Sequence, residues 1–181
     1  KAGPAALQQQ AGDVAGELAN AAQRLDAEYR WPYQNHDSIG PSCAVADVRA
    51  DGATVWSGTQ GVYQLRAALA DLLALPEDSI HVIYQQASGC YGHNGADDAA
   101  ADAALLSKLC GRPVRVQWSR ADEHGWNPKG PAMLMRLAGG LSAAGDLLAW
   151  RFANWTPTHL TRPNGQTGKA ALLAGQLAYN L

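Results

Sequence analysis

Residues 88–95, which read SGCYGHNG, constrain the fold of this chain more than any other segment. They follow a β-branched run, 79–85, that is typical of a strand, and they precede an alanine-rich run, 96–109, that is typical of a helix. Glycines on either side of an aromatic residue let backbone amides approach a ligand closely, because a Cβ would block the approach. The pattern predicts a strand, a glycine loop and a helix in succession, with a tight turn or a phosphate cradle as the alternatives for the loop.

The remaining elements follow from periodicity and turn residues. Asp51-Gly52 lies between two alternating apolar runs and indicates a hairpin. Gly111 and Pro113 mark the end of a helix, and Asp13 is a candidate N-cap. In order, we expect a helix at 13–25, an extended segment at 26–33, a hairpin of 42–49 and 53–58, a helix at 62–73, a strand at 79–85, a helix at 96–109, a strand at 114–119, and a second hairpin of 133–141 and 147–156.

Helices and strands that do not alternate strictly favour an α+β fold, in which helices cover one face of a mixed sheet. We expect one domain over 13–156, because 181 residues are enough for a single sizeable core. Residues 1–12 are predicted to be a linker or frayed end. Residues 157–181 are predicted to be a poorly patterned tail with an alanine-rich helix near its end.

Composition excludes several classes of function. A formal net charge of −2 gives no electrostatic reason to bind nucleic acid or an anionic membrane, and no apolar run is long enough for a membrane span. Three widely spaced cysteines, Cys43, Cys90 and Cys110, form neither a disulfide framework nor a paired metal motif. We expect Cys43 and Cys110 to be small buried residues. The start at Lys1 and the alanine-rich end suggest a fragment of a larger subunit.

Three segments together carry a family resemblance: Ser57-Gly58-Thr59-Gln60, the loop 88–95, and 111–120, which reads GRPVRVQWSR. Over about 27–156 the chain resembles the molybdopterin-binding subunit of the xanthine dehydrogenase and aldehyde oxidoreductase family. It is most similar to the bacterial isoquinoline 1-oxidoreductase and nicotinate dehydrogenase branch. The resemblance implies a partial molybdenum-cofactor-binding domain.

The resemblance also implies roles for single residues. Gln60 would donate a hydrogen bond to an oxygen on the molybdenum, which a neutral amide does without adding charge. Gly89, Tyr91 and Gly92 would bind the cofactor through their backbone, so a branched side chain at Gly92 is expected to obstruct it. Most of the family has three glycines and then phenylalanine, where this chain has Ser88-Gly89-Cys90 and then Tyr91.

His93 and Asn94 would line a substrate pocket that is more polar than usual in the family, and a helix cap is the alternative for Asn94. Two other possibilities for this region draw little support from the sequence. A zinc site of His36, Cys90 and His93 lacks a fourth ligand with convincing spacing, so no metal site made of side chains is predicted. A nucleophilic pair of Cys90 and His36, with Asp37 or Asn35 orienting the imidazole, is formally open.

The resemblance implies an oxidoreductase that oxidises an aldehyde or N-heteroaromatic substrate with water-derived oxygen. It implies a molybdopterin-type cofactor, with the cytosine dinucleotide form as a candidate. The expected partners are a small [2Fe-2S] subunit and, as a further candidate, a flavin or cytochrome subunit. Nothing in the chain matches the family's glutamate base, so the isolated chain is expected to be inactive. The alternative is a non-catalytic structural or interaction domain of the same ancestry. The compartment, cytoplasmic or periplasmic, stays open.

Overall fold

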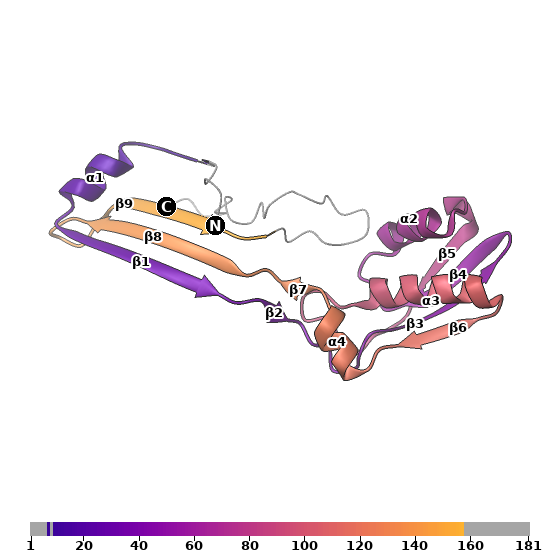
Figure 1. Ribbon diagram of the computed structural model, residues 1–181. Helices are drawn as coiled ribbons and strands as arrows, with labels where there is room; N and C mark the ends of the chain where they lie inside the picture. Colours follow the sequence, from indigo (N-terminus) through magenta and orange to yellow (C-terminus); the bar gives the residue numbers. More distant parts are fainter. Residues whose placement is uncertain (1–6, 8, 158–181) are drawn as a thin grey trace. The chain divides into compact units, whose positions relative to one another are not determined.

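The structure is a computed structural model that describes residue 7 and residues 9–157. The chain divides into two compact units (Figure 1). Among the described residues, the first unit comprises those up to Tyr33 and those from Pro131 onward, and the second comprises Gln34–Gly130. The predicted helix near the C-terminal end lies outside the described residues.

A four-stranded mixed sheet forms the centre of the second unit. Its strands are β3 (Cys43–Arg49), β4 (Gly52–Ser57), β5 (Ile80–Tyr84) and β6 (Val114–Gln117), in the order β5-β4-β3-β6. β4 and β5 are parallel, and the other two pairs are antiparallel. The first predicted hairpin is confirmed, because β3 and β4 pair directly across the Asp51-Gly52 turn.

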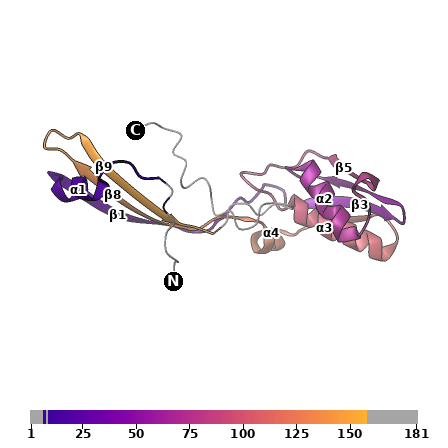
Figure 2. The ribbon, with the colours of Figure 1, turned by 90° about the horizontal axis from the view of Figure 1, so that it is seen from above.

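Two helices, α2 (Val62–Leu73) and α3 (Ala96–Cys110), pack on the same face of this sheet (Figure 2). The alanines of α3 are completely buried at positions 99, 100, 103 and 104, and their small side chains let the helix lie close to the strands. Leu65, Leu69 and Leu73 of α2 fill the rest of this core. The α+β prediction, a mixed sheet with helices on one face, is therefore confirmed.

One helix of the second unit was not predicted. The expected strand 114–119 ends at Gln117, and Ser119 begins α4 (Arg120–Trp126). Ser119 and Asp122 form a reciprocal capping box, a signal that the sequence carries as Ser-x-x-Asp. A 3-10 turn, η1 (Glu77–Ser79), precedes β5, and the short strands β2 (Gln34–Asn35) and β7 (Lys129–Gly130) pair with each other.

The first unit is a three-stranded antiparallel sheet with one short helix. α1 (Val14–Asn20) is followed by β1 (Gln23–Trp31), and β8 (Met133–Leu141) and β9 (Leu147–Trp155) form the second predicted hairpin. Asp13 caps α1 as predicted, because its carboxylate accepts a hydrogen bond from the Gly16 amide at 2.9 Å. The prediction that this helix continues to Leu25 is wrong, because Leu25 pairs with Gly139 inside the sheet.

The two faces of this sheet differ. α1 covers one face, where Leu18, Ala138 and Ala149 are buried. Gly140 makes this packing possible, because a Cβ there would lie 2.9 Å from the Cβ of Ala21. The opposite face exposes large apolar side chains: Leu25, Tyr29, Trp31, Trp150 and Phe152.

The expectation that Cys43 and Cys110 are buried was wrong. Cys110 is exposed, because it is the last residue of α3, and Cys43 is only partly buried on β3. Leu72, another apolar residue of α2, is 43% exposed. In the part of the chain that the structure describes, no helix combines the length and apolar character that crossing a membrane requires.

Candidate functional site

The two loops that the sequence singles out meet at one edge of the mixed sheet. β4 and β5 are parallel neighbours, so the residues that follow Ser57 and Tyr84 leave the sheet together, at the carboxyl ends of these two strands. There the side chain of Gln60 joins both loops. Its Nε2 donates to the Gly92 carbonyl at 3.0 Å, and its Oε1 accepts from the Asn94 amide at 3.2 Å.

This pair of hydrogen bonds leaves part of the Gln60 amide available. A carboxamide NH₂ group has two N–H bonds, and Gly92 is the one acceptor that Gln60 finds among the described residues. Gln60 itself is exposed. Its second N–H group can therefore donate to a ligand without breaking the contact that holds the glycine loop.

The glycine loop has an unusual backbone. Gly89, Tyr91 and Gly92 have φ angles of +109°, +43° and +127°, and of these three only the glycines adopt such angles without steric cost. The ring of Tyr91 turns back toward Gly89, where an added Cβ would lie 3.0 Å from its Cζ. Tyr91 is nevertheless 59% exposed, so part of the phenol faces solvent.

The space above Gly92 is filled by another side chain of the protein. A Cβ at Gly92 would lie 2.5 Å from Cδ2 and 2.7 Å from Nε2 of His36. His36 follows β2 directly, and its Nδ1 lies 2.9 Å from the carbonyl oxygen of Pro128. Sequence reasoning considered His36 as a metal ligand or a base but did not place it against this loop.

Neither candidate partner orients His36. Asp37 forms an ion pair with Arg120 at 2.6 Å, and Asn35 bonds to His124 and Lys129. The contacts that would orient His36 for a nucleophilic pair with Cys90 are therefore not formed in the structure. Among the described residues, no group of three or more His, Cys, Asp or Glu side chains is arranged to hold a metal ion.

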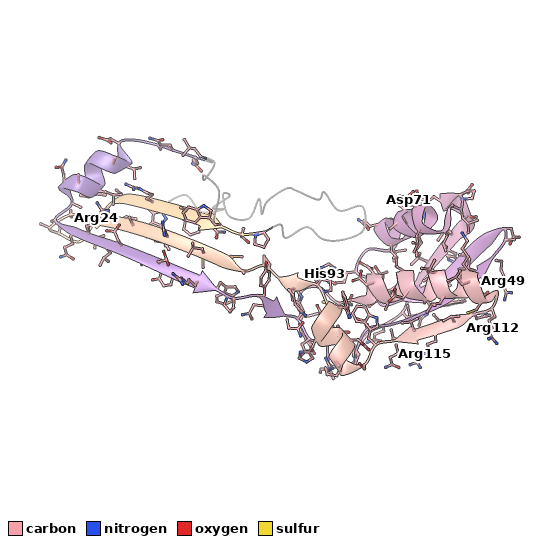
Figure 3. All side chains as sticks on the ribbon, viewed as in Figure 1. Arg24, Arg49, Asp71, His93, Arg112 and Arg115 are labelled. Carbon is pink, nitrogen blue, oxygen red and sulfur yellow. The ribbon has the colours of Figure 1, made fainter. Side chains whose placement is uncertain are left out.

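The two predicted substrate-pocket residues differ in their surroundings. Asn94 is buried, its Nδ2 donates to the Gly58 carbonyl at 3.0 Å, and its Oδ1 accepts from the Ala96 amide at 3.2 Å. The N-cap of α3 is Gly95, so Asn94 lies one residue before the cap, and its Oδ1 accepts from the amide of the first helical residue. His93 is half-buried in the loop that leads into α3 (Figure 3).

Buried polar groups that sequence reasoning missed attach this edge to α3. The Thr59 hydroxyl donates to Asp97 at 2.5 Å and accepts from the Gly61 amide at 3.0 Å. The Ser57 hydroxyl donates to the Ala96 carbonyl at 3.1 Å. These bonds fix the end of β4, and with it Gln60, to the first turn of α3.

α4 supports the other side of the loop. Glu123 is fully buried and accepts from the Ser42 amide at 2.7 Å, from the Ser42 hydroxyl at 3.2 Å and from Asn127 at 3.2 Å. Arg120 donates to the Ser38 carbonyl at 2.9 Å, and the Ser38 hydroxyl donates to the Gly89 carbonyl at 2.9 Å. The segment 38–42 thus ties the glycine loop to α4.

A cavity of about 300 Å³ adjoins the loop on the sheet face that α2 and α3 leave uncovered. Gly58, Gly89 and Asn94 form its border with the site, and Trp56 of β4 lines it from the sheet. Its other polar lining comes from hydroxyl, thiol and carboxamide side chains: Ser38, Ser42, Cys43, Gln85, Gln86, Ser88 and Gln117. None of its lining residues carries a formal charge, so the cavity suits a neutral polar group.

Solved molybdenum hydroxylases have a similar fold. The quinoline 2-oxidoreductase of Pseudomonas putida 86 superimposes with a TM-score of 0.72 at 20% identity, over 80% of this chain and 19% of that one. The aldehyde oxidoreductase of Desulfovibrio gigas superimposes with a TM-score of 0.70 at 19% identity, over 81% and 16%. At such identities the likeness concerns the fold.

The sequence comparisons give the family. Residues 2–173 match the molybdopterin cofactor-binding domain, and the chain belongs to that family. It is 54% identical over 164 residues to a nicotinate dehydrogenase subunit of Pseudomonas putida, and 32% identical over 98 residues to an isoquinoline 1-oxidoreductase subunit of Brevundimonas diminuta. These alignments cover 91% and 54% of this chain but 13% and 12% of the two relatives, so the chain spans only a small part of their length.

Proposed function

We propose that this chain is the part of a molybdenum hydroxylase subunit that holds one side of a molybdopterin-type cofactor, in an enzyme that oxidises an N-heteroaromatic substrate with water-derived oxygen. The observation that carries the proposal is the junction of Gln60 with Gly92 and Asn94, which keeps one amide N–H group free at the edge of the sheet. The family membership supports the class of cofactor.

The residues at this edge suit such a cofactor. Gln60, Tyr91 and Gly92 offer uncharged N–H donors, which stabilise negatively charged oxygen atoms without adding a positive charge. Gly89 and Gly92 add no side chain of their own to the backbone that would make the contact, although His36 lies where a Cβ of Gly92 would be. When bound, the cofactor supplies the metal at which the substrate is oxidised. The cytosine dinucleotide form is part of this proposal.

The two sequence relatives described above favour an N-heteroaromatic substrate over an aldehyde. Nicotinate dehydrogenase, at 54% identity, and isoquinoline 1-oxidoreductase, at 32%, are both named for nitrogen heterocycles. We propose that His93 lies at the substrate, because it is half-buried in the loop between Gly92 and the buried Asn94. Asn94 then shapes the pocket from beneath through its bond to Gly58.

The rest of the enzyme would complete the site. No residue of this chain matches the family's glutamate base, so the base would come from elsewhere in the full-length protein. Electrons would leave through a small [2Fe-2S] subunit, with a flavin or cytochrome subunit as a further carrier. The chain alone is therefore proposed to be inactive.

Replacement of Gln60 by alanine in the full-length enzyme tests this proposal. We expect most of the molybdenum to remain bound, because one neutral hydrogen bond is lost. Turnover should fall on the order of 10²-fold, as when a comparable transition-state donor is removed. Metal analysis and steady-state rates on an N-heteroaromatic such as isoquinoline measure the two effects, with Gln23→Ala on the exposed strand β1 as control.

Unchanged turnover of Gln60→Ala at full molybdenum occupancy would show that Gln60 does not face the metal. A wild-type protein without molybdenum would favour the alternative, a non-catalytic domain of the same ancestry.

A further inference from the structure

The imidazole of His36 occupies the position that a side chain at residue 92 would take. An ideal Cβ on Gly92 would lie 2.5 Å from Cδ2 and 2.7 Å from Nε2 of His36, closer than real Cβ contacts. Any residue other than glycine would therefore have to displace either the imidazole or the loop. The φ angle of +127° at Gly92 is a second, independent reason for glycine.

The imidazole is itself held in place. Its Nδ1 lies 2.9 Å from the Pro128 carbonyl, and since a carbonyl oxygen only accepts, Nδ1 carries a proton. Asn35 pairs with Lys129 where β2 meets β7, which brings the next residue, His36, beside Pro128. A Cβ on Gly130 would lie 3.7 Å from Nε2, an ordinary van der Waals contact, so the ring also lies near that strand.

Gly92 thus has a fixed contact on two sides. Gln60 donates to its carbonyl at 3.0 Å, and His36 lies against its Cα. Together they determine where the backbone of Tyr91 and Gly92 points.

We infer that His36 is the positioning residue of the glycine loop, and that His36, rather than a bound cofactor, is what a side chain at position 92 would meet, in addition to the strain that the φ angle imposes there. The inference rests on the proposed function only where it links the loop to cofactor retention. It also changes the expected effect of a side chain at Gly92: the added atoms meet His36 first, and the cofactor is lost because the loop moves.

A double-mutant cycle in the full-length enzyme tests the inference. The four proteins are wild type, His36→Ala, Gly92→Ala and the double variant, and the readouts are molybdenum content, the electron paramagnetic resonance spectrum of the reduced protein, and kcat and KM for isoquinoline. Gly92→Ala should lower molybdenum content by roughly tenfold when His36 is present. The same substitution should lower molybdenum content much less when residue 36 is alanine. Such a dependence of one substitution on the other is typical of residues in contact.

Two conservative variants separate the contact from the hydrogen bond. His36→Asn places an amide where Nδ1 lies, so it should keep the bond to Pro128, remove the atoms above Gly92 and tolerate Gly92→Ala. His36→Phe should fill the space above Gly92 without forming the hydrogen bond to Pro128. This variant should not tolerate Gly92→Ala. His81→Ala, an exposed histidine of β5, is the control and should leave all readouts unchanged. If His36→Ala does not fold, His36→Asn takes its place in the cycle.

Equal losses from Gly92→Ala in the wild-type background and in the His36→Asn background would overturn the inference, because the φ angle alone would then explain the glycine. If the wild type holds no molybdenum, the proposed function fails instead. Thermal unfolding of the same four proteins still measures the coupling between the two positions, and additive changes in Tm would then overturn the inference.

Discussion

At the scale of single residues, Asp98 carries a charge in an unfavourable place. Partial burial in the first turn of α3, and then the charges of Asp97 and Asp102, raise the pKa of its carboxyl to about 6 from an ordinary 3.8. The helix dipole favours a negative charge there, so burial and repulsion outweigh it. Because the pKa is raised by folding, the stabilising effect of the protonated group is complete below about pH 4 and is lost as the pH rises through 6.

Asp98→Asn should therefore make the chain at least as stable as wild type at pH 7, with a difference that shrinks toward pH 4. The gain should be small, because the side chain is also exposed to solvent. Urea denaturation between pH 4.5 and 7.5 measures it, with Asp71→Asn, at an exposed position in the last turn of α2, as a comparison (Figure 3). A variant that loses stability at pH 7 would show that the dipole dominates.

At the scale of elements, α4 is attached to the sheet through one buried carboxylate. Glu123→Ala would leave the Ser42 amide and hydroxyl and the Asn127 amide without their acceptor. Each buried donor left unpaired costs about 1–3 kcal/mol. Glu123→Gln should also be destabilising, because an NH₂ group would face donors on either side. Chemical denaturation gives the loss in free energy of unfolding.

Glu17→Ala, at an exposed position of α1, is the control. It should change the free energy of unfolding by no more than about 1 kcal/mol. If Glu123→Ala were as mild as this control, α4 would not depend on its buried carboxylate. The segment 38–42 and the glycine loop should loosen together with α4, since Ser38 and Ser42 connect them.

At the scale of the whole molecule, the two units have cores of very different size. Among the described residues, fifteen buried apolar residues form the core of the second unit, and three form that of the first. We expect the amides of β1, β8 and β9 to exchange with solvent faster than those of β3 and β4 in the 181-residue chain, because small cores open more readily. Hydrogen exchange read by mass spectrometry measures this difference.

Two buried leucines provide a matched pair for that experiment. Leu18 and Leu69 are each 1% exposed, in α1 and α2 respectively. Leu18→Ala should speed exchange in β8 and β9 only, and Leu69→Ala should speed it in β4 and β5 only. Faster exchange in both sheets from either substitution would mean that the units unfold as one.

The elements that the sequence determined by itself depend on neighbouring residues. Asp51-Gly52 sets a hairpin, Gly111 ends α3 in a left-handed conformation, and 62–73 forms a helix with the predicted bounds. The resemblance also directed attention to Gln60 and the glycine loop, which do meet. In these cases the deciding interactions lie within a few residues along the chain or within a recognisable motif.

The tertiary structure decided everything that depends on partners distant in sequence. Leu25 leaves the helical pattern because β8, more than a hundred residues later, pairs with it. Glu123 is buried because Ser42 supplies its donors, and a side chain at position 92 would meet His36 in addition to the strain of its φ angle. No local propensity encodes such contacts, since they form only when the strands bring both residues together.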